Sequence, residues 1–92
     1  MFSHVMLGAN DIEESKVFYD ETLLVLGARP GKLSLNHDGH TRYVYFVNNK
    51  NSFIISQPIN NQEASHGNGA TIGFNASSTD MVDEWYQAGK NA

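Results

Sequence analysis

Two stretches that repeat one another decide the fold: His4-Val-Met-Leu-Gly-Ala-Asn-Asp-Ile-Glu-Glu-Ser-Lys-Val-Phe-Tyr19 and Thr71-Ile-Gly-Phe-Asn-Ala-Ser-Ser-Thr-Asp-Met-Val-Asp-Glu-Trp-Tyr86. They align without a gap, and the second starts at position 71, which is 67 positions after position 4. Each copy reads as a short apolar strand, a polar cap and an amphipathic helix that carries an aromatic residue followed by Tyr. A repeat of this length is typical of a duplicated supersecondary unit, whose copies complete one another's apolar faces.

Length and composition describe one small globular domain. The 92 residues are 40% hydrophobic and 17% charged, and a chain of this size buries a little over ~60% of its unfolded surface, enough for a single core. Ten acidic and six scattered basic residues argue against nucleic acid or a membrane surface as a partner, because both require a clustered basic patch. The lack of cysteine and of a long apolar run near the N-terminus favours a cytoplasmic protein.

The first copy predicts a strand over residues 2–9 and a helix over 11–26. Apolar residues in the helix recur three to four positions apart, which predicts one buried face. Asn10 and Glu13 have the spacing of a capping box at the start of the helix. Gly27 is suited to end it, since glycine tolerates the left-handed conformation that follows many helices.

Three further strands are predicted over residues 32–36, 41–47 and 52–57. Asp38-Gly39 predicts the hairpin turn between the first two, and the asparagine-rich residues 48–51 predict the next turn. The strand over 41–47 has the strongest pattern, because it is rich in β-branched and aromatic residues. Its alternation predicts two faces, one with Tyr43 and Tyr45 and the other with Arg42, Val44 and Phe46.

The second copy begins after a polar, glycine-bearing linker over residues 59–69. It predicts a strand over 70–75 and a helix over 78–88. Ser77 is the expected cap of this helix, and Gly89 the expected stop.

The predicted fold class is therefore α+β. Residues 1–66 form one βαβββ module with its linker, and residues 67–92 form an incomplete second module of strand and helix only, within one structural domain. A complete second module would need three more strands, and none is predicted before Ala92.

The order of these features resembles the vicinal oxygen chelate superfamily of glyoxalase I, bleomycin and fosfomycin resistance proteins, and extradiol dioxygenases. It is most similar to small glyoxalase-like proteins of bacteria. The segments that carry the resemblance are the first strand, the start and aromatic pair of the first helix, the end of that helix and the glycine-bearing start of the second module: His4-Val-Met-Leu, Asp11-Ile-Glu-Glu-Ser15, Phe18-Tyr19, Leu26-Gly27 and Gly67-Asn68-Gly69.

The resemblance implies a sheet curled around a pocket that holds a divalent metal, with ligands from the first and last strands of each module. His4 occupies the first-strand position, and a neutral imidazole is a suitable ligand. The strand over 52–57 has no carboxylate where the family often has Glu, so Gln57 is the available oxygen donor. Thr71 stands opposite His4 in the second copy, where the family often has His, and is expected to contact the ligand.

Other side chains leave alternatives open. Arg42 shares a face with Val44 and Phe46, so it would pair with an anionic ligand if that face is concave; otherwise it is a solvated edge residue. His37 and His40 flank Asp38 and would make a two-histidine metal pair, although a polar turn is the commoner explanation. His66 is expected to be a loop residue, and the helix aromatics Phe18, Tyr19, Trp85 and Tyr86 to lie in the core.

The resemblance implies a glyoxalase-related protein that acts on small molecules, and three functions stay open. The first is a metal-dependent lyase, isomerase or dioxygenase-like enzyme. The second is a metal-free protein that binds or sequesters a small apolar or aromatic molecule, as resistance proteins do. The third is a chain that is inactive alone, whose second module seeks a partner chain. The expected assembly is a homodimer, with exchange of the strand over 70–75 or of a module as a variant.

Overall fold

The structure is a computed structural model that describes residues 2–46, 51–65 and 67–92. These residues form two helices and a sheet of four strands, so the predicted α+β class is confirmed. No helix among them is both long and apolar enough to cross a bilayer. In chain order the elements are β1 (His4–Gly8), α1 (Ile12–Val25), β2 (Lys32–Leu35), β3 (Thr41–Phe46), β4 (Ser52–Ser56) and α2 (Thr79–Asn91).

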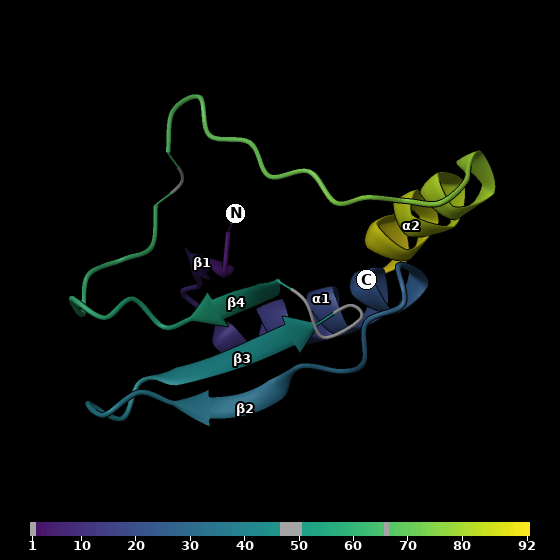
Figure 1. The fold of residues 1–92 in the computed structure, drawn as a ribbon. Helices are drawn as coiled ribbons and strands as arrows, with labels where there is room; N and C mark the ends of the chain where they lie inside the picture. Colours follow the sequence, from purple (N-terminus) through teal and green to yellow (C-terminus); the bar gives the residue numbers. More distant parts are fainter. Residues whose placement is uncertain (1, 47–50, 66) are drawn as a thin grey trace.

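The sheet has the strand order β1-β4-β3-β2. β1 and β4 are parallel, while β3 pairs antiparallel with both β4 and β2. α1 packs on one face of the sheet, chiefly against β3 and β4, and α2 packs against α1. In Figure 1 the chain leaves β4, passes in a long arc above the sheet and returns to α2 at the right.

The boundaries of α1 differ from the prediction by one residue at the start. Asp11, not Asn10, is the N-cap, and its carboxylate accepts the N–H of Glu14 at 3.0 Å. Asn10 Oδ1 instead accepts the N–H of Ala64 at 2.6 Å and so ties the linker to the start of α1. Both side chains are good caps, and local sequence does not reveal that Asn10 is needed elsewhere.

Gly27 follows the end of α1 as predicted, although the helix ends at Val25, one residue before the predicted position 26. Gly27 has φ +99°, and its N–H bonds to Leu24 O, while the N–H of Ala28 bonds to Leu23 O. This pair of bonds is a Schellman motif, which satisfies the last carbonyls of the helix.

The start of α2 shows the same one-residue difference. Ser78, not Ser77, is the N-cap, and Ser78 Oγ accepts the N–H of Met81 at 3.1 Å. Asp11 and Ser78 are themselves 67 positions apart, so the repeat extends to the observed caps. Gly89 was expected to stop the helix, but α2 continues to Asn91. A β-carbon on Gly89 would lie 3.6 Å from Thr22 Cγ2, so this glycine lies where α2 packs on α1.

The predicted strand over 70–75 is wrong, because this segment is paired with no strand in the described structure. Its counterpart β1 takes its hydrogen bonds from β4. Residues 67–92, all of which the structure describes, contain no counterpart of β4, and a strand is defined by such non-local pairing. Of the other predictions, Val47, most of the 48–51 turn and His66 lie outside the described residues.

The core lies between α1 and the sheet. Tyr43 and Tyr45 are buried there, 8% and 2% exposed, as the alternation of the strand predicts. Phe18 and Tyr86 were expected in the core but are 39% and 62% exposed, because they border a groove between α1 and α2. The remaining core side chains are Ala9, Ile12, Leu23, Ala28, Phe53 and Ile55, with Tyr19 and Leu26 packed against them.

Candidate functional site

Strand register divides the sheet into a helix face and an open face. Residues paired directly across neighbouring strands point to the same side. Phe53 pairs with Tyr45, and Ile55 with Tyr43, on the helix face under α1. The open face carries the alternating residues in three rows across the strands: Gly8, Ser56, Arg42 and Ser34; then Met6, Ile54, Val44 and Lys32; then His4, Ser52 and Phe46.

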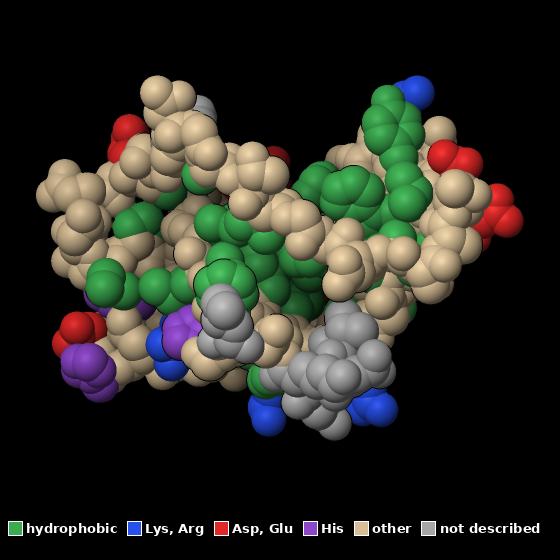
Figure 2. All heavy atoms as spheres, turned by 45° about the horizontal axis from the view of Figure 1, so that its top comes forward, with side chains coloured by type: hydrophobic (Ala, Val, Ile, Leu, Met, Phe, Trp, Pro, Cys, Tyr) green, Lys and Arg blue, Asp and Glu red, His purple; other side chains and the backbone are tan. Residues whose placement is uncertain are grey.

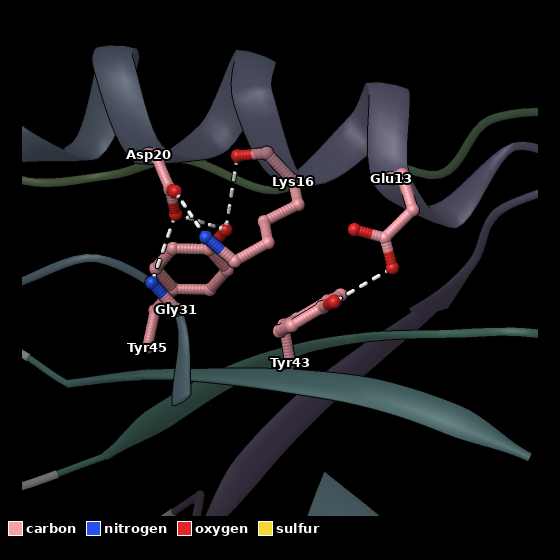
Figure 3. A network of polar contacts seen from close by, with 6 residues as sticks. All are labelled: Glu13, Lys16, Asp20, Gly31, Tyr43 and Tyr45. Carbon is pink, nitrogen blue, oxygen red and sulfur yellow. Dashed lines mark hydrogen bonds and ion pairs between the residues drawn. The ribbon is translucent and has the colours of Figure 1, made fainter. Parts of the chain in front are cut away.

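A polar network joins α1 to the helix face (Figure 3). Asp20 is its centre: Oδ1 accepts the Tyr45 hydroxyl and the N–H of Gly31, both at 2.8 Å, and Oδ2 accepts Lys16 Nζ. Gly31 approaches so closely that a β-carbon there would lie 2.7 Å from Tyr45 Cζ. Only glycine therefore lets this backbone reach the carboxylate.

The network shifts the pKa values of its members. Burial alone would raise the pKa of Asp20, but hydrogen bonds from Gly31, Lys16 and Tyr45, together with the charge of Lys16, lower it overall. Burial, followed by the bond to Asp20, raises the pKa of Tyr45 far above its ordinary value. Tyr43 donates to Glu13 Oε1 at 2.6 Å, and this bond raises the pKa of Tyr43. Both tyrosines therefore stay protonated and hold the helix on the sheet.

A cleft, here called the seam cleft, separates the edge of β1 from residues 64–65 and 67–77. Its first cavity has a volume of about 500 Å³ and passes between β1, α1 and this segment. In Figure 2, hydrophobic side chains gather in the middle of the face shown, between the linker and α2. The side chains that shape the cavity are Leu7, Tyr19, Phe53, Thr71, Ile72 and Phe74.

A second cavity of about 560 Å³ shares three of these walls, Phe53, Ile72 and Phe74, and extends toward Leu23 and Met81. The rings of Phe53 and Phe74 meet edge to face at a centroid distance of 5.2 Å. The ring centroids of Tyr19 and Phe53 lie 5.0 Å apart. Each cavity has the size of a small-molecule pocket, for which ~300–1,000 Å³ is usual.

The predicted site residues are not gathered in one place. Thr71 lines the seam cleft. His4 and Arg42 lie on the open face, but His4 shares its row with Ser52 and Phe46, while Arg42 shares its row with Gly8. Two residue positions along each strand separate neighbouring rows, so His4 and Arg42 lie at opposite ends of this face.

The donors at His4 and Gln57 do not fit a divalent metal site. His4 pairs with Ser52 in β4, five positions before Gln57, a separation of about 16 Å at ~3.3 Å per residue. Gln57 Oε1 already accepts the N–H of Thr41 at 2.9 Å. In the part of the chain that the structure describes, no three His, Cys, Asp or Glu side chains gather. A structural or catalytic zinc site needs at least three protein ligands.

The two turn histidines contact side chains of the turn and of the linker. His37 is almost fully exposed, and its Nε2 lies 3.7 Å from Asp38 Oδ2. Asn36 Oδ1 accepts the N–H groups of Asp38 and His40, so Asn36 Nδ2 faces His40 Nδ1 at 3.2 Å. His40 Nε2 lies 3.0 Å from Asn61 Oδ1. Amides therefore engage both ring nitrogens of His40, as the polar-turn interpretation predicts.

Sequence reasoning did not identify the aromatic walls of the seam cleft. Tyr19 and Phe53 have the alternation or spacing of ordinary core residues, and Phe74 was assigned to a paired strand. The one available signal was the repeat, which sets Leu7 opposite Phe74 at matched positions of the two copies. Both residues line the cleft.

Comparison with known proteins identifies the class that has this arrangement of strands and helices. The profile of the Glyoxalase/Bleomycin resistance protein/Dioxygenase superfamily matches residues 1–92, and the chain belongs to that family. The crystal structure of a glyoxalase/bleomycin resistance protein from Albidiferax ferrireducens T118 is similar, with 47% sequence identity and a TM-score of 0.86. The match covers 99% of this chain and 70% of that chain. No curated protein matches this chain.

Proposed function

We propose that this protein binds a small apolar or aromatic molecule in the seam cleft and does so without a metal. The observation that carries the proposal is a cavity of about 500 Å³ with three aromatic walls, Tyr19, Phe53 and Phe74. Aromatic rings supply large apolar area and favour edge-to-face contact with an aromatic guest. Thr71 and Asn10 add polar groups at the border, so a guest with one hydroxyl or N–H group would be oriented there.

The expected affinity is modest. A guest such as indole that buries about 150–200 Å² gains about 4–5 kcal/mol at ~25 cal/mol per Å². This free energy corresponds to a Kd of roughly 0.2–1 mM. A natural ligand that fills both cavities would bind more tightly, since the two cavities share walls.

Titration of the protein with indole, followed by amide chemical shifts in NMR, tests the proposal. Shifts should be centred on the segment 70–77 and the end of β1. Phe74→Ala should weaken binding about three- to tenfold, the loss expected for one aromatic contact. Phe46→Ala is the matched control, because Phe46 is similarly exposed, 43% against 37%, and lies on the open face. Equal loss in both variants, or shifts spread over the open face, would refute the seam cleft as the site.

The alternative is a metal-dependent lyase, isomerase or dioxygenase-like activity, as the family implies. This alternative rests on His4 as the first ligand and requires donors that the described residues do not bring beside it. We therefore favour metal-free binding, with a cytoplasmic location as expected for a chain without cysteine.

We also propose that two copies of the chain associate. Among the described strands, β1 lies at an edge of the sheet and pairs with β4 alone. The extended segment 70–75 pairs with no described strand and carries the exposed side chains Ile72 and Phe74. Unpaired edges and apolar side chains together favour association with another chain, and exchange of this segment between copies is the form that the repeat favours.

A further inference from the structure

We propose that the open face holds an anion site at Arg42, separate from the seam cleft, that binds the carboxylate of a small organic acid. The site lies in the row of the open face formed by Ser34, Arg42, Ser56 and Gly8, which strand register brings side by side across the sheet. None of these residues lines either cavity of the seam cleft except Gly8, at its border. The proposal is therefore independent of the proposed function.

Arg42 is a half-buried cation without a counter-ion. The ion pairs in the described structure are Lys16 with Asp20 and His37 with Asp38. All ten Asp and Glu residues of the chain lie in the described part, so no carboxylate of the chain neutralises Arg42. A partly buried charge without a partner is costly, and an anionic ligand would remove that cost.

The hydrogen bonds of Arg42 are also incomplete. Nη2 donates to Ser34 Oγ at 3.2 Å, and Nε is buried without an acceptor. A buried donor without an acceptor destabilises the folded protein. Carboxylates take up the Nε and Nη donors of a guanidinium as a parallel pair of bonds, and this geometry favours arginine over lysine at such sites.

The neighbours of Arg42 fit an oxyanion and an apolar body. The hydroxyl of Ser34 accepts from Arg42 and so keeps its own proton free to donate. Pro58 and the linker close the row at its Gly8 end. A β-carbon on Gly8 would lie 3.3 Å from Ala64 Cβ and 3.6 Å from Pro58 Cγ. The adjacent row offers Val44 and Ile54, both half-buried and apolar. A carboxylate on Arg42 would thus place an attached ring or chain over Val44 and Ile54.

The test uses benzoate as the probe and the Arg42 Nε–H resonance of the 92-residue protein as the reporter. Benzoate should move this resonance, whereas benzamide, which has the same shape and no charge, should bind at least tenfold more weakly. Arg42→Gln should weaken benzoate binding at least tenfold, the loss expected for charge-assisted bonds. Arg29→Gln is the matched control, because Arg29 is an exposed arginine beyond the end of α1.

Several results would overturn the proposal. An unmoved Nε–H resonance would do so even if Arg42→Gln does not fold, since that measurement needs no variant. Equal affinity of benzoate for the two variants, or equal affinity of benzamide and benzoate, would do so as well. Inorganic phosphate is the third probe: a response to phosphate with none to benzoate would overturn the assignment to a carboxylate.

Discussion

Asp20 is the residue on which the attachment of α1 to the sheet most depends. Its carboxylate accepts from Tyr45, Gly31 and Lys16, which come from β3, the segment before β2 and α1 itself. These bonds lower the pKa of Asp20 in the folded state. A carboxyl whose pKa is lower when folded stabilises the fold above its unfolded pKa, near ~4, and the stabilisation is lost as the pH falls through the folded pKa.

We expect Asp20→Asn to reduce the free energy of unfolding by about 1–2 kcal/mol at pH 7. This loss of stability is modest because the carboxylate is partly exposed and asparagine keeps one acceptor oxygen. The variant should also lose less stability than the wild type between pH 5 and pH 2, since it lacks the titrating group. Urea denaturation across this range measures both quantities, with the exposed neighbour change Glu21→Gln as the control. An unchanged pH dependence in Asp20→Asn would contradict the role given to this carboxylate.

Other single residues could be predicted in type but not in role. Alternation correctly assigned Tyr43 and Tyr45 to one face and Arg42 to the other. It could not show that both tyrosines donate to carboxylates on α1, because those contacts span 30 and 25 positions of sequence. His4 was singled out from the family resemblance, but its surroundings depend on register, which brings it beside Ser52 and Phe46.

At the scale of elements, the repeat predicts the two helices well and their first residues less well. Asp11 and Ser78 cap the helices, one position after the expected Asn10 and Ser77. In each pair both residues are good caps, so propensity alone does not choose between them. The choice is made by contacts elsewhere: Asn10 binds the linker, and Ser77 contacts the sulfur of Met81.

The caps provide a test with a built-in control. Ser78→Ala should lower the free energy of unfolding by about 1 kcal/mol, because it removes the acceptor for the N–H of Met81. Ser77→Ala should cost much less, since it removes only a weak contact with sulfur. Thermal or urea denaturation of the two variants would distinguish them. A larger loss in Ser77→Ala would show that α2 starts where the sequence predicted.

The prediction of a strand over 70–75 was wrong for a different reason. Its residues alternate as a strand should, and local pattern is all that sequence reasoning can assess. A strand also needs a partner with free backbone groups, and the described chain offers this segment none. The seam cleft could not be predicted from local pattern for a similar reason. Its walls come from β1, α1, β4 and the segment after the linker, which are distant from one another in sequence.

At the scale of the whole molecule, the unpaired segment predicts association. Sedimentation equilibrium should show a dimer whose population rises with protein concentration. Ile72→Lys should shift the equilibrium toward monomer, because it places a charge on the exposed apolar segment. Val17→Lys is the control, because Val17 is exposed on α1 and lines neither cavity of the seam cleft. A monomer at all concentrations would contradict the proposed association.

The division into a first module over 1–66 and an incomplete second module over 67–92 remains a proposal. It is supported by the shared spacing of 67 positions between repeats and between caps. Family membership and the α+β fold follow from sequence order, because they depend on which elements succeed one another. The ligand and its site depend on side chains brought together from distant segments, and these required the structure.

The central claim is that the protein binds its ligand without a metal. The most direct measurement is the Kd of indole after removal of metal with a chelator, compared with the Kd after addition of Zn²⁺ or Mn²⁺. We predict Kd values within twofold of one another in the wild type and in His4→Ala. His4 lies on the open face, and no residue of its row lines the first cavity. Binding that is at least tenfold tighter with metal, and only when His4 is present, would contradict the claim.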